Sequence, residues 1–95
     1  MTRFKSPRPN LFVSDDGVSV EILGLTGLRY GEGPRQMKVS AEVVTGSSAL
    51  AIWASSIRRW SPPHESELVS DADRARIIEN IRGAIRSQGY EVDVI

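Results

Sequence analysis

The chain has 95 residues, which suffice for one domain and leave no room for a second hydrophobic core. Twelve Arg and Lys residues balance twelve Asp and Glu residues, so no overall field favours nucleic acid or an anionic membrane. The absence of cysteine excludes a disulfide framework and a thiolate nucleophile. No run reaches transmembrane length and the N-terminus lacks an apolar signal core, so we expect a cytoplasmic protein with no membrane partner.

Residues 1–10 predict a basic arm outside the folded domain. The arm contains three cations and two prolines, namely Arg3, Lys5, Pro7, Arg8 and Pro9. Because proline interrupts regular backbone hydrogen bonding, we expect this arm to be frayed or to lie extended across the surface. Residues 11–95 should then form a single α+β domain.

Alternating apolar and polar residues predict antiparallel strands after the arm. Leu11–Val13 and Val18–Ile22 flank Asp15-Asp16-Gly17, a strong hairpin signal because these turn residues favour positive φ. Another strand begins at Leu28. The clearest strand is Gln36–Val44, in which every second residue is apolar, as is typical of an antiparallel sheet with one wet face.

Glycine-containing segments separate these strands. Residues 24–27 and 31–34 resemble phosphate-binding loops, but neither leads into a helix and neither has the lysine of a P-loop, so both predict turns. Residues 46–48 end the Gln36–Val44 strand. Leu50–Trp53 is a further strand, with Ile57–Trp60 as a candidate continuation.

One amphipathic helix is predicted from Asp71 to Gln88. Ser70 is an N-cap with Asp73 in capping-box position, and Gly89 suits the left-handed conformation just past the helix. Apolar residues recur at helical spacing on one face, at Ile77, Ile78, Ile81, Ala84 and Ile85. The opposite, solvated face is expected to comprise Arg76, Glu79, Asn80, Gly83, Arg86 and Ser87.

Arg74 projects close to the apolar face of this helix. Two interpretations stay open: a packed stem with the guanidinium at the rim, or a buried ion pair.

The fold predicted from these elements is α+β. An antiparallel meander of four to six strands would be covered on its apolar face by the long C-terminal helix, and Val92–Ile95 would return as a final short strand. Neither the Leu11–Val13 run nor the Leu50–Trp53 run is well protected by lysine or proline. An exposed edge there can pair across a two-fold axis, so we also expect a homodimer.

His64 is the only histidine, so a metal site with several histidines is impossible, and acid–base catalysis by His64 with a serine would need a positioned partner. A mixed site of His64 with Glu65 and Glu67 can be drawn, but these residues lie in an exposed loop with no visible neighbours that would orient them as ligands. The serines occur in turn and cap contexts that do not position a nucleophile. We therefore expect no enzyme activity, no metal and no cofactor; the alternative is a small enzyme or ligand-binding domain that uses the loop around His64.

The Arg58–Glu67 segment is the best candidate for a partner-binding surface. It combines two cations, an aromatic side chain, two prolines and two carboxylates, and prolines reduce the entropy lost when a loop is ordered on binding. The predicted contact residues are Arg58, Arg59, Trp60, His64, Glu65 and Glu67. One of the two tryptophans should be core; Trp60, beside Pro62-Pro63, is expected to be an exposed anchor, unless it fastens the loop to the helix. Weak nucleic-acid binding is a third possibility, which the zero net charge disfavours.

Several short motifs together carry a family resemblance. They are Tyr30-x-Glu32, a charged strand reaching Glu42, Trp53, Trp60-x-Pro62-Pro63, Leu68-Val-Ser-Asp and Arg74-x-x-Ile77-Ile78-x-x-Ile81. This order resembles a family of small bacterial immunity proteins, which are encoded beside polymorphic toxins and have relatives in mobile gene cassettes. The similarity spans Val18 to Val94. It implies a non-catalytic protein that neutralises a cognate toxin by binding it, and it carries over no catalytic residues.

Overall fold

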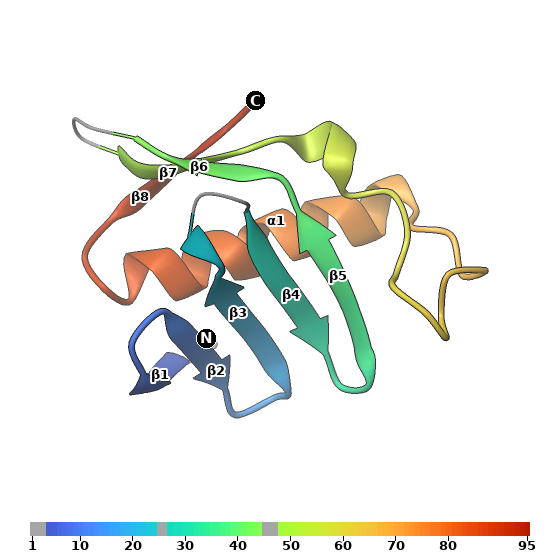
Figure 1. Cartoon of the computed structure of the whole chain (residues 1–95), viewed down its shortest axis with the longest axis horizontal. Helices are drawn as coiled ribbons and strands as arrows, with labels where there is room; N and C mark the ends of the chain where they lie inside the picture. Colours follow the sequence, from blue (N-terminus) through green and yellow to red (C-terminus); the bar gives the residue numbers. More distant parts are fainter. Residues whose placement is uncertain (1–3, 25–26, 45–47) are drawn as a thin grey trace.

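The structure, a computed structural model, describes residues 4–24, 27–44 and 48–95 (Figure 1). Its elements in these ranges are β1 Phe4–Arg8, β2 Leu11–Ser14, β3 Val18–Ile22, β4 Leu28–Glu32, β5 Arg35–Val39, β6 Ala41–Val43, β7 Ser48–Ile52, a 3-10 turn Ala54–Ser56, α1 Asp71–Arg86 and β8 Glu91–Val94. The turns predicted at 24–27 and 46–48 lie partly outside the described residues.

Strands β1 to β5 form an antiparallel sheet in chain order, here called sheet A, which confirms the predicted α+β meander. The hairpin predicted from Asp-Gly between β2 and β3 is also confirmed, but the positive φ expected of both turn residues is found at Gly17 and not at Asp16. Gly17 has a φ of 87° and donates its N–H to the carbonyl oxygen of Ser14 at 3.3 Å. A residue with a Cβ would be strained at that φ, so the glycine is what permits the tight turn.

The expectation of irregular backbone near the N-terminus is wrong for Phe4–Arg8. This segment pairs with β2 as an edge strand, and its register shifts between Lys5 and Arg8. Pro7 falls inside that shift, where the regular ladder is already interrupted, so the ring is tolerated. The division of the chain into an arm at 1–10 and a domain at 11–95 stays a prediction.

The segment predicted as one long strand, Gln36–Val44, belongs to two sheets. The chain leaves sheet A after Val39, and β6 pairs antiparallel with β7, which β8 joins in parallel to form the three-stranded sheet B. Val39 and Ala41 are both buried, so the apolar alternation continues through the break and conceals it. The final strand is confirmed, but it lies beside β7 rather than in the meander.

The two sheet edges predicted for self-association are not edges. Strand β2 lies between β1 and β3, and β7 lies between β6 and β8. The outer strands of sheet A are β1 and β5. The homodimer therefore stays a prediction that has lost its stated basis, and light scattering at micromolar concentration would test it.

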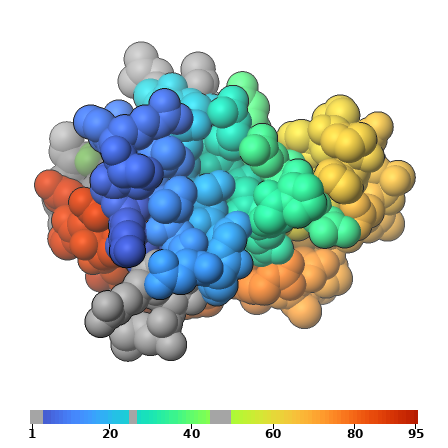
Figure 2. All heavy atoms as spheres, turned by 90° about the horizontal axis from the view of Figure 1, so that it is seen from below, coloured from blue at the N-terminus to red at the C-terminus, as the bar shows by residue number. Residues whose placement is uncertain are grey.

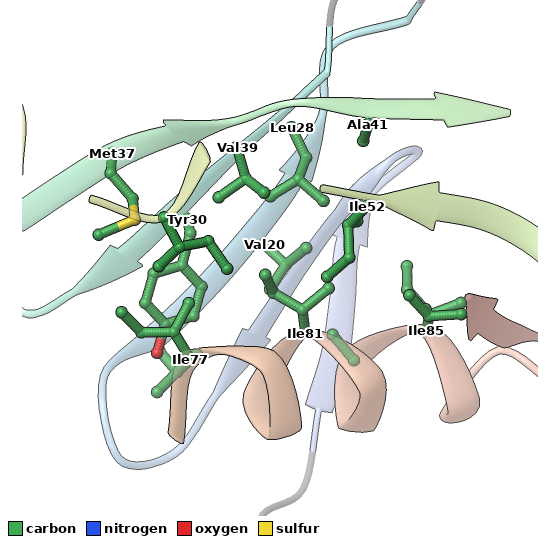
Figure 3. Close-up of a cluster of buried hydrophobic side chains, with 14 of the residues drawn as sticks. Val20, Leu28, Tyr30, Met37, Val39, Ala41, Ile52, Ile77, Ile81 and Ile85 are labelled. Carbon is green, nitrogen blue, oxygen red and sulfur yellow. The ribbon is translucent and has the colours of Figure 1, made fainter. Parts of the chain in front are cut away.

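Helix α1 packs against the inner face of sheet A, as Figure 1 shows, and none of the helices in the described residues is long and apolar enough to cross a membrane. The predicted capping box is confirmed: Ser70 and Asp73 exchange two hydrogen bonds of 3.1 Å. The helix ends at Arg86, two residues earlier than predicted. Figure 3 shows its isoleucines facing the apolar side chains of both sheets; the labelled residues are Val20, Leu28, Tyr30, Met37, Val39, Ala41, Ile52, Ile77, Ile81 and Ile85.

Asn80, expected on the solvated face of the helix, is half-buried instead. Its Nδ2 donates to the hydroxyl of Tyr30 at 2.9 Å. Gly83 is also partly covered, because Phe4 lies over it: a Cβ built on Gly83 would be 3.4 Å from the Phe4 ring. Strand β1 is thus anchored to the helix as well as to β2.

Candidate functional site

The Arg58–Glu67 segment runs from the 3-10 turn to α1 beside the outer edge of β5. Ser61 donates its N–H to the carbonyl oxygen of Gln36 at 2.7 Å, and an isolated bridge joins Arg59 to Leu68. The predicted strand continuation at Ile57–Trp60 is therefore reduced to this single bridge. Figure 2 shows the loop projecting beside the β4–β5 end of sheet A and the start of the helix.

Trp60 belongs to the hydrophobic core. Only 5% of the residue is exposed, and its ring stacks on Tyr30 with centroids 6.3 Å apart and planes at 28°. The expectation that Trp60 is an exposed anchor is wrong, and Trp53 is the more accessible of the two tryptophans. Trp60 fastens the loop to sheet A, because a buried aromatic pair fixes the backbone that carries it.

Charged side chains surround Trp60 and line a hollow of about 210 Å³, here called the ion-paired hollow. Its lining residues are Glu32, Arg35, Trp60, Glu67, Leu68, Asp73 and Arg76. The guanidinium of Arg76 donates two hydrogen bonds of 3.0 Å to the carboxylate of Glu32 and one of 2.7 Å to Asp73. The hydrogen bond from Arg76, followed by those with Ser70, holds the pKa of the Asp73 carboxyl below its usual range.

Tyr30 connects the ion-paired hollow to the core. Its hydroxyl donates to Glu32 and accepts from Asn80, so the one polar atom of a fully buried ring is satisfied. Burial, followed by the Glu32 carboxylate, raises the pKa of the Tyr30 hydroxyl well above its ordinary value. This hydroxyl is therefore a structural donor and stays protonated.

The carboxylate of Glu67 is held at the other side of the hollow. Arg35 donates to its Oε1 from Nε at 3.0 Å and from Nη2 at 2.6 Å, while Nδ1 of His64 lies 2.8 Å from Oε2. Arg35 keeps the pKa of the Glu67 carboxyl below its usual range. His64 thus has a carboxylate within reach, but that carboxylate is already engaged by a guanidinium and His64 is not among the residues that line the hollow.

Residues 4–24, 27–44 and 48–95 contain no group of three His, Asp or Glu side chains that could hold a metal ion.

Arg74 adopts the first of its two predicted arrangements. Its Nε donates to the carbonyl oxygen of Ile57 at 3.1 Å, and Nη1 meets Asp71 at 2.7 Å, where the aspartate is fully exposed. The stem packs and the ion pair lies at the rim.

The remaining predicted contact residues are at the surface. Arg58, Arg59 and Glu65 are exposed, and in the described ranges neither arginine takes part in an ion pair. The structure therefore brings His64 and Glu67 together and buries Trp60. Arg58, Arg59 and Glu65 are accessible to a partner.

A second hollow, of about 530 Å³, lies where the segment begins, beside the 3-10 turn and the residue that follows β5, and is here called the β5-edge hollow. It is lined by Ser40, Trp53, Ser55, Ser56 and Arg58. Ser56 organises it: its Oγ accepts the N–H of Ser40 at 3.0 Å and donates to the carbonyl oxygen of Trp53 at 2.6 Å. Sequence reasoning placed Arg58 at the site but missed Trp53 and the serines.

Residues 23–95 match a protein-family model described as Immunity protein 74. The chain belongs to this immunity protein family. The matched residues include β4 to β8, α1 and the lining of both hollows, whereas β1 to β3 precede the matched region. The resemblance carried by the short motifs is thereby confirmed as that of an immunity protein of polymorphic toxin systems. No curated protein and no solved structure gives a significant match.

Proposed function

We propose that this immunity protein neutralises a cognate toxin by binding it directly, without catalysis. The observation that carries the proposal is the family match over residues 23–95, which supports a toxin-neutralising role. We further propose that the toxin is encoded beside this gene in a bacterial genome, on a mobile cassette, and that neutralisation takes place in the cytoplasm.

The contact surface we propose is the exposed part of the Arg58–Glu67 segment. Arg58, Arg59 and Glu65 would contact the toxin, and Trp60 would hold the loop in position from beneath. The loop is also tied to β5 through Ser61. A loop that is already ordered loses less entropy on binding, which favours a tight complex.

A catalytic role at His64 is the alternative, and the 2.8 Å contact between His64 Nδ1 and Glu67 is the observation in its favour. Against it, both oxygens of Glu67 are engaged, since Arg35 holds the other. We therefore expect His64→Gln, which retains hydrogen-bonding capacity, to protect cells as well as the wild type does. Loss of protection in a His64→Gln variant that still binds the toxin would favour the alternative.

The test is co-expression of this protein with the toxin-like product of the neighbouring gene. The wild type should restore growth and co-purify with that product, and the double variant Arg58→Ala with Arg59→Ala should do so much less well. The matched control is Arg82→Ala, which removes a helix arginine whose only described ion pair is with Glu79 at the surface. If the wild type neither protects nor binds, immunity is wrong for that pair. If the double variant protects fully, the proposed surface is wrong although the function stands.

A further inference from the structure

The outer face of sheet A, which points away from α1, carries a row of charges. The strand register places Arg8, Leu11, Glu21, Arg29 and Lys38 side by side across five strands. Glu21 lies 2.6 Å from Arg8 and 3.2 Å from Arg29, so its charge is shared between the two arginines. Lys38, at the β5 end of the row, forms no ion pair with any residue that the structure describes. Unbalanced positive charge therefore collects at the β5 edge.

The Arg58–Glu67 segment adds two further cations to the same edge. The hydroxyl of Ser56 accepts a hydrogen bond from the N–H of Ser40, two residues after Lys38. The N–H of Ser61 donates a hydrogen bond to the carbonyl oxygen of Gln36, two residues before Lys38. The backbone between Ser56 and Ser61, which carries Arg58 and Arg59, consequently runs alongside Lys38. Three exposed cations without described ion-pair partners thus lie along one short stretch of β5.

The β5-edge hollow supplies the other half of a binding site. Trp53 is half-buried and lines the hollow together with Arg58 and three serines. An indole offers a flat apolar surface at little entropic cost, a guanidinium can hold a carboxylate through two hydrogen bonds, and serine hydroxyls can serve as donors or acceptors. The combination suits a peptide segment that presents an acidic residue next to an apolar one.

The ion-paired hollow is a poorer site for the same ligand. There Arg35 and Arg76 are already bonded to Glu67, Glu32 and Asp73, so an incoming carboxylate would have to displace an existing partner. At the β5 edge no such exchange is needed, because Arg58 is free of described ion pairs.

We propose that the toxin docks at the β5-edge hollow through an acidic segment, with a carboxylate on Arg58 and an apolar side chain on Trp53. Lys38 and Arg59 flank the segment and attract it. This inference rests on the proposed function and names the chemistry of the partner's surface.

Charge reversal tests the electrostatic half of the proposal. Binding of an inactivated form of the neighbouring toxin-like protein is measured by surface plasmon resonance at low and high salt. Lys38→Glu and Arg58→Glu should each lower the association rate at low salt by about tenfold, and the loss should shrink at high salt. The control is Lys5→Glu, the same charge change on the same sheet face but at the β1 edge, at an exposed residue that forms no ion pair with the described residues; it should change the rate by less than about twofold.

Tryptophan fluorescence tests the docking position. In a Trp60→Phe variant the remaining emission comes from Trp53, and in a Trp53→Phe variant it comes from the buried Trp60. Addition of the partner should shift the emission of Trp53 to shorter wavelength, because the indole leaves water, and should leave that of Trp60 unchanged.

The outcomes separate the two proposals. If the wild type does not bind the neighbouring protein, the proposed function and this inference both fail for that pair. If it binds, but Lys38→Glu and Arg58→Glu bind equally well and Trp53 emission does not move, only this inference fails. Tighter binding of the wild type to a random DNA duplex than to the toxin-like protein would also overturn it, because the acidic partner would then be a nucleic acid.

Discussion

Replacing Trp60 with alanine should unfold the protein at a much lower temperature rather than remove a binding contact. The residue is 5% exposed and stacks on Tyr30 at a centroid distance of 6.3 Å. Truncating a buried tryptophan forfeits the transfer free energy of the indole and leaves a cavity, which together cost about 3–5 kcal/mol. Since a domain is stable by roughly 5–15 kcal/mol, this is a large share of the total.

Scanning calorimetry gives the corresponding shift in melting temperature. In a domain of 60–100 residues 1 kcal/mol corresponds to about 4–8 °C, so Trp60→Ala should melt about 12–40 °C below the wild type. Trp60→Phe, which keeps an aromatic ring against Tyr30, should lose much less. Arg59→Ala is the neighbouring control; the side chain is exposed and unpaired in the described structure, so its melting temperature should stay within about 4 °C of the wild type.

Two results would refute this reasoning. If Trp60→Ala melts within about 4 °C of the wild type, the indole does not contribute to the core. If Trp60→Ala and Arg59→Ala lower the melting temperature equally, burial does not explain the effect. Loss of protection by Trp60→Ala at 37 °C would by itself say nothing about an interface, which is why Arg58 and Arg59 carry the binding tests.

Three further predictions concern the helix, a turn and an ion pair. Ile81→Asp should abolish the cooperative thermal transition, because it places an unpaired carboxylate at a fully buried position; an unchanged melting curve would contradict the packing of α1. Gly27→Ala should lower the free energy of unfolding in urea by more than about 1 kcal/mol, since φ is 121° and the new Cβ would lie 2.5 Å from the backbone oxygen of Val39; a neutral result would contradict that geometry. Arg35→Met should raise the NMR-measured pKa of Glu67 towards its ordinary value, and an unmoved pKa would show that the ion pair is not formed in solution. The folded-state pKa of Glu67 is depressed, so the ion pair stabilises the wild type above the unfolded-state pKa of Glu67. The difference in unfolding free energy between the wild type and Arg35→Met should therefore be largest there and disappear as the pH falls through the folded-state pKa.

The sequence predicted the local elements well because local rules govern them. The Asp-Gly hairpin depends on the φ angles of neighbouring residues, and the start of α1 depends on Ser70 and Asp73, three residues apart. Strand β1 was missed because Pro7 argues against pairing, and a register shift that accommodates a proline leaves no trace in the composition.

The step from sheet A to sheet B at Ser40 was missed for a different reason. Periodicity records which side chains are buried, and burial is the same on both sides of the break. Which strands are neighbours depends on contacts between distant segments, so the parallel pairing of β7 with β8 could not be read from alternation.

The candidate site was predicted in part. The Arg58–Glu67 segment stood out because its residue types are clustered in sequence. The more accessible indole is that of Trp53 rather than Trp60, because Tyr30 stacks on the ring of Trp60 and covers it, and that contact spans thirty residues. The bond from Arg76 to Glu32 crosses 44 positions and gives no signal in the spacing.

Titration calorimetry of the purified protein with an inactivated form of the neighbouring toxin-like protein tests the central claim most directly. If the protein neutralises the toxin by direct binding, the titration should saturate at a fixed stoichiometry, and inhibition of the active toxin should rise in proportion to the fraction bound. Cells that are protected from the toxin while the purified proteins show no heat of binding and no inhibition would contradict direct binding.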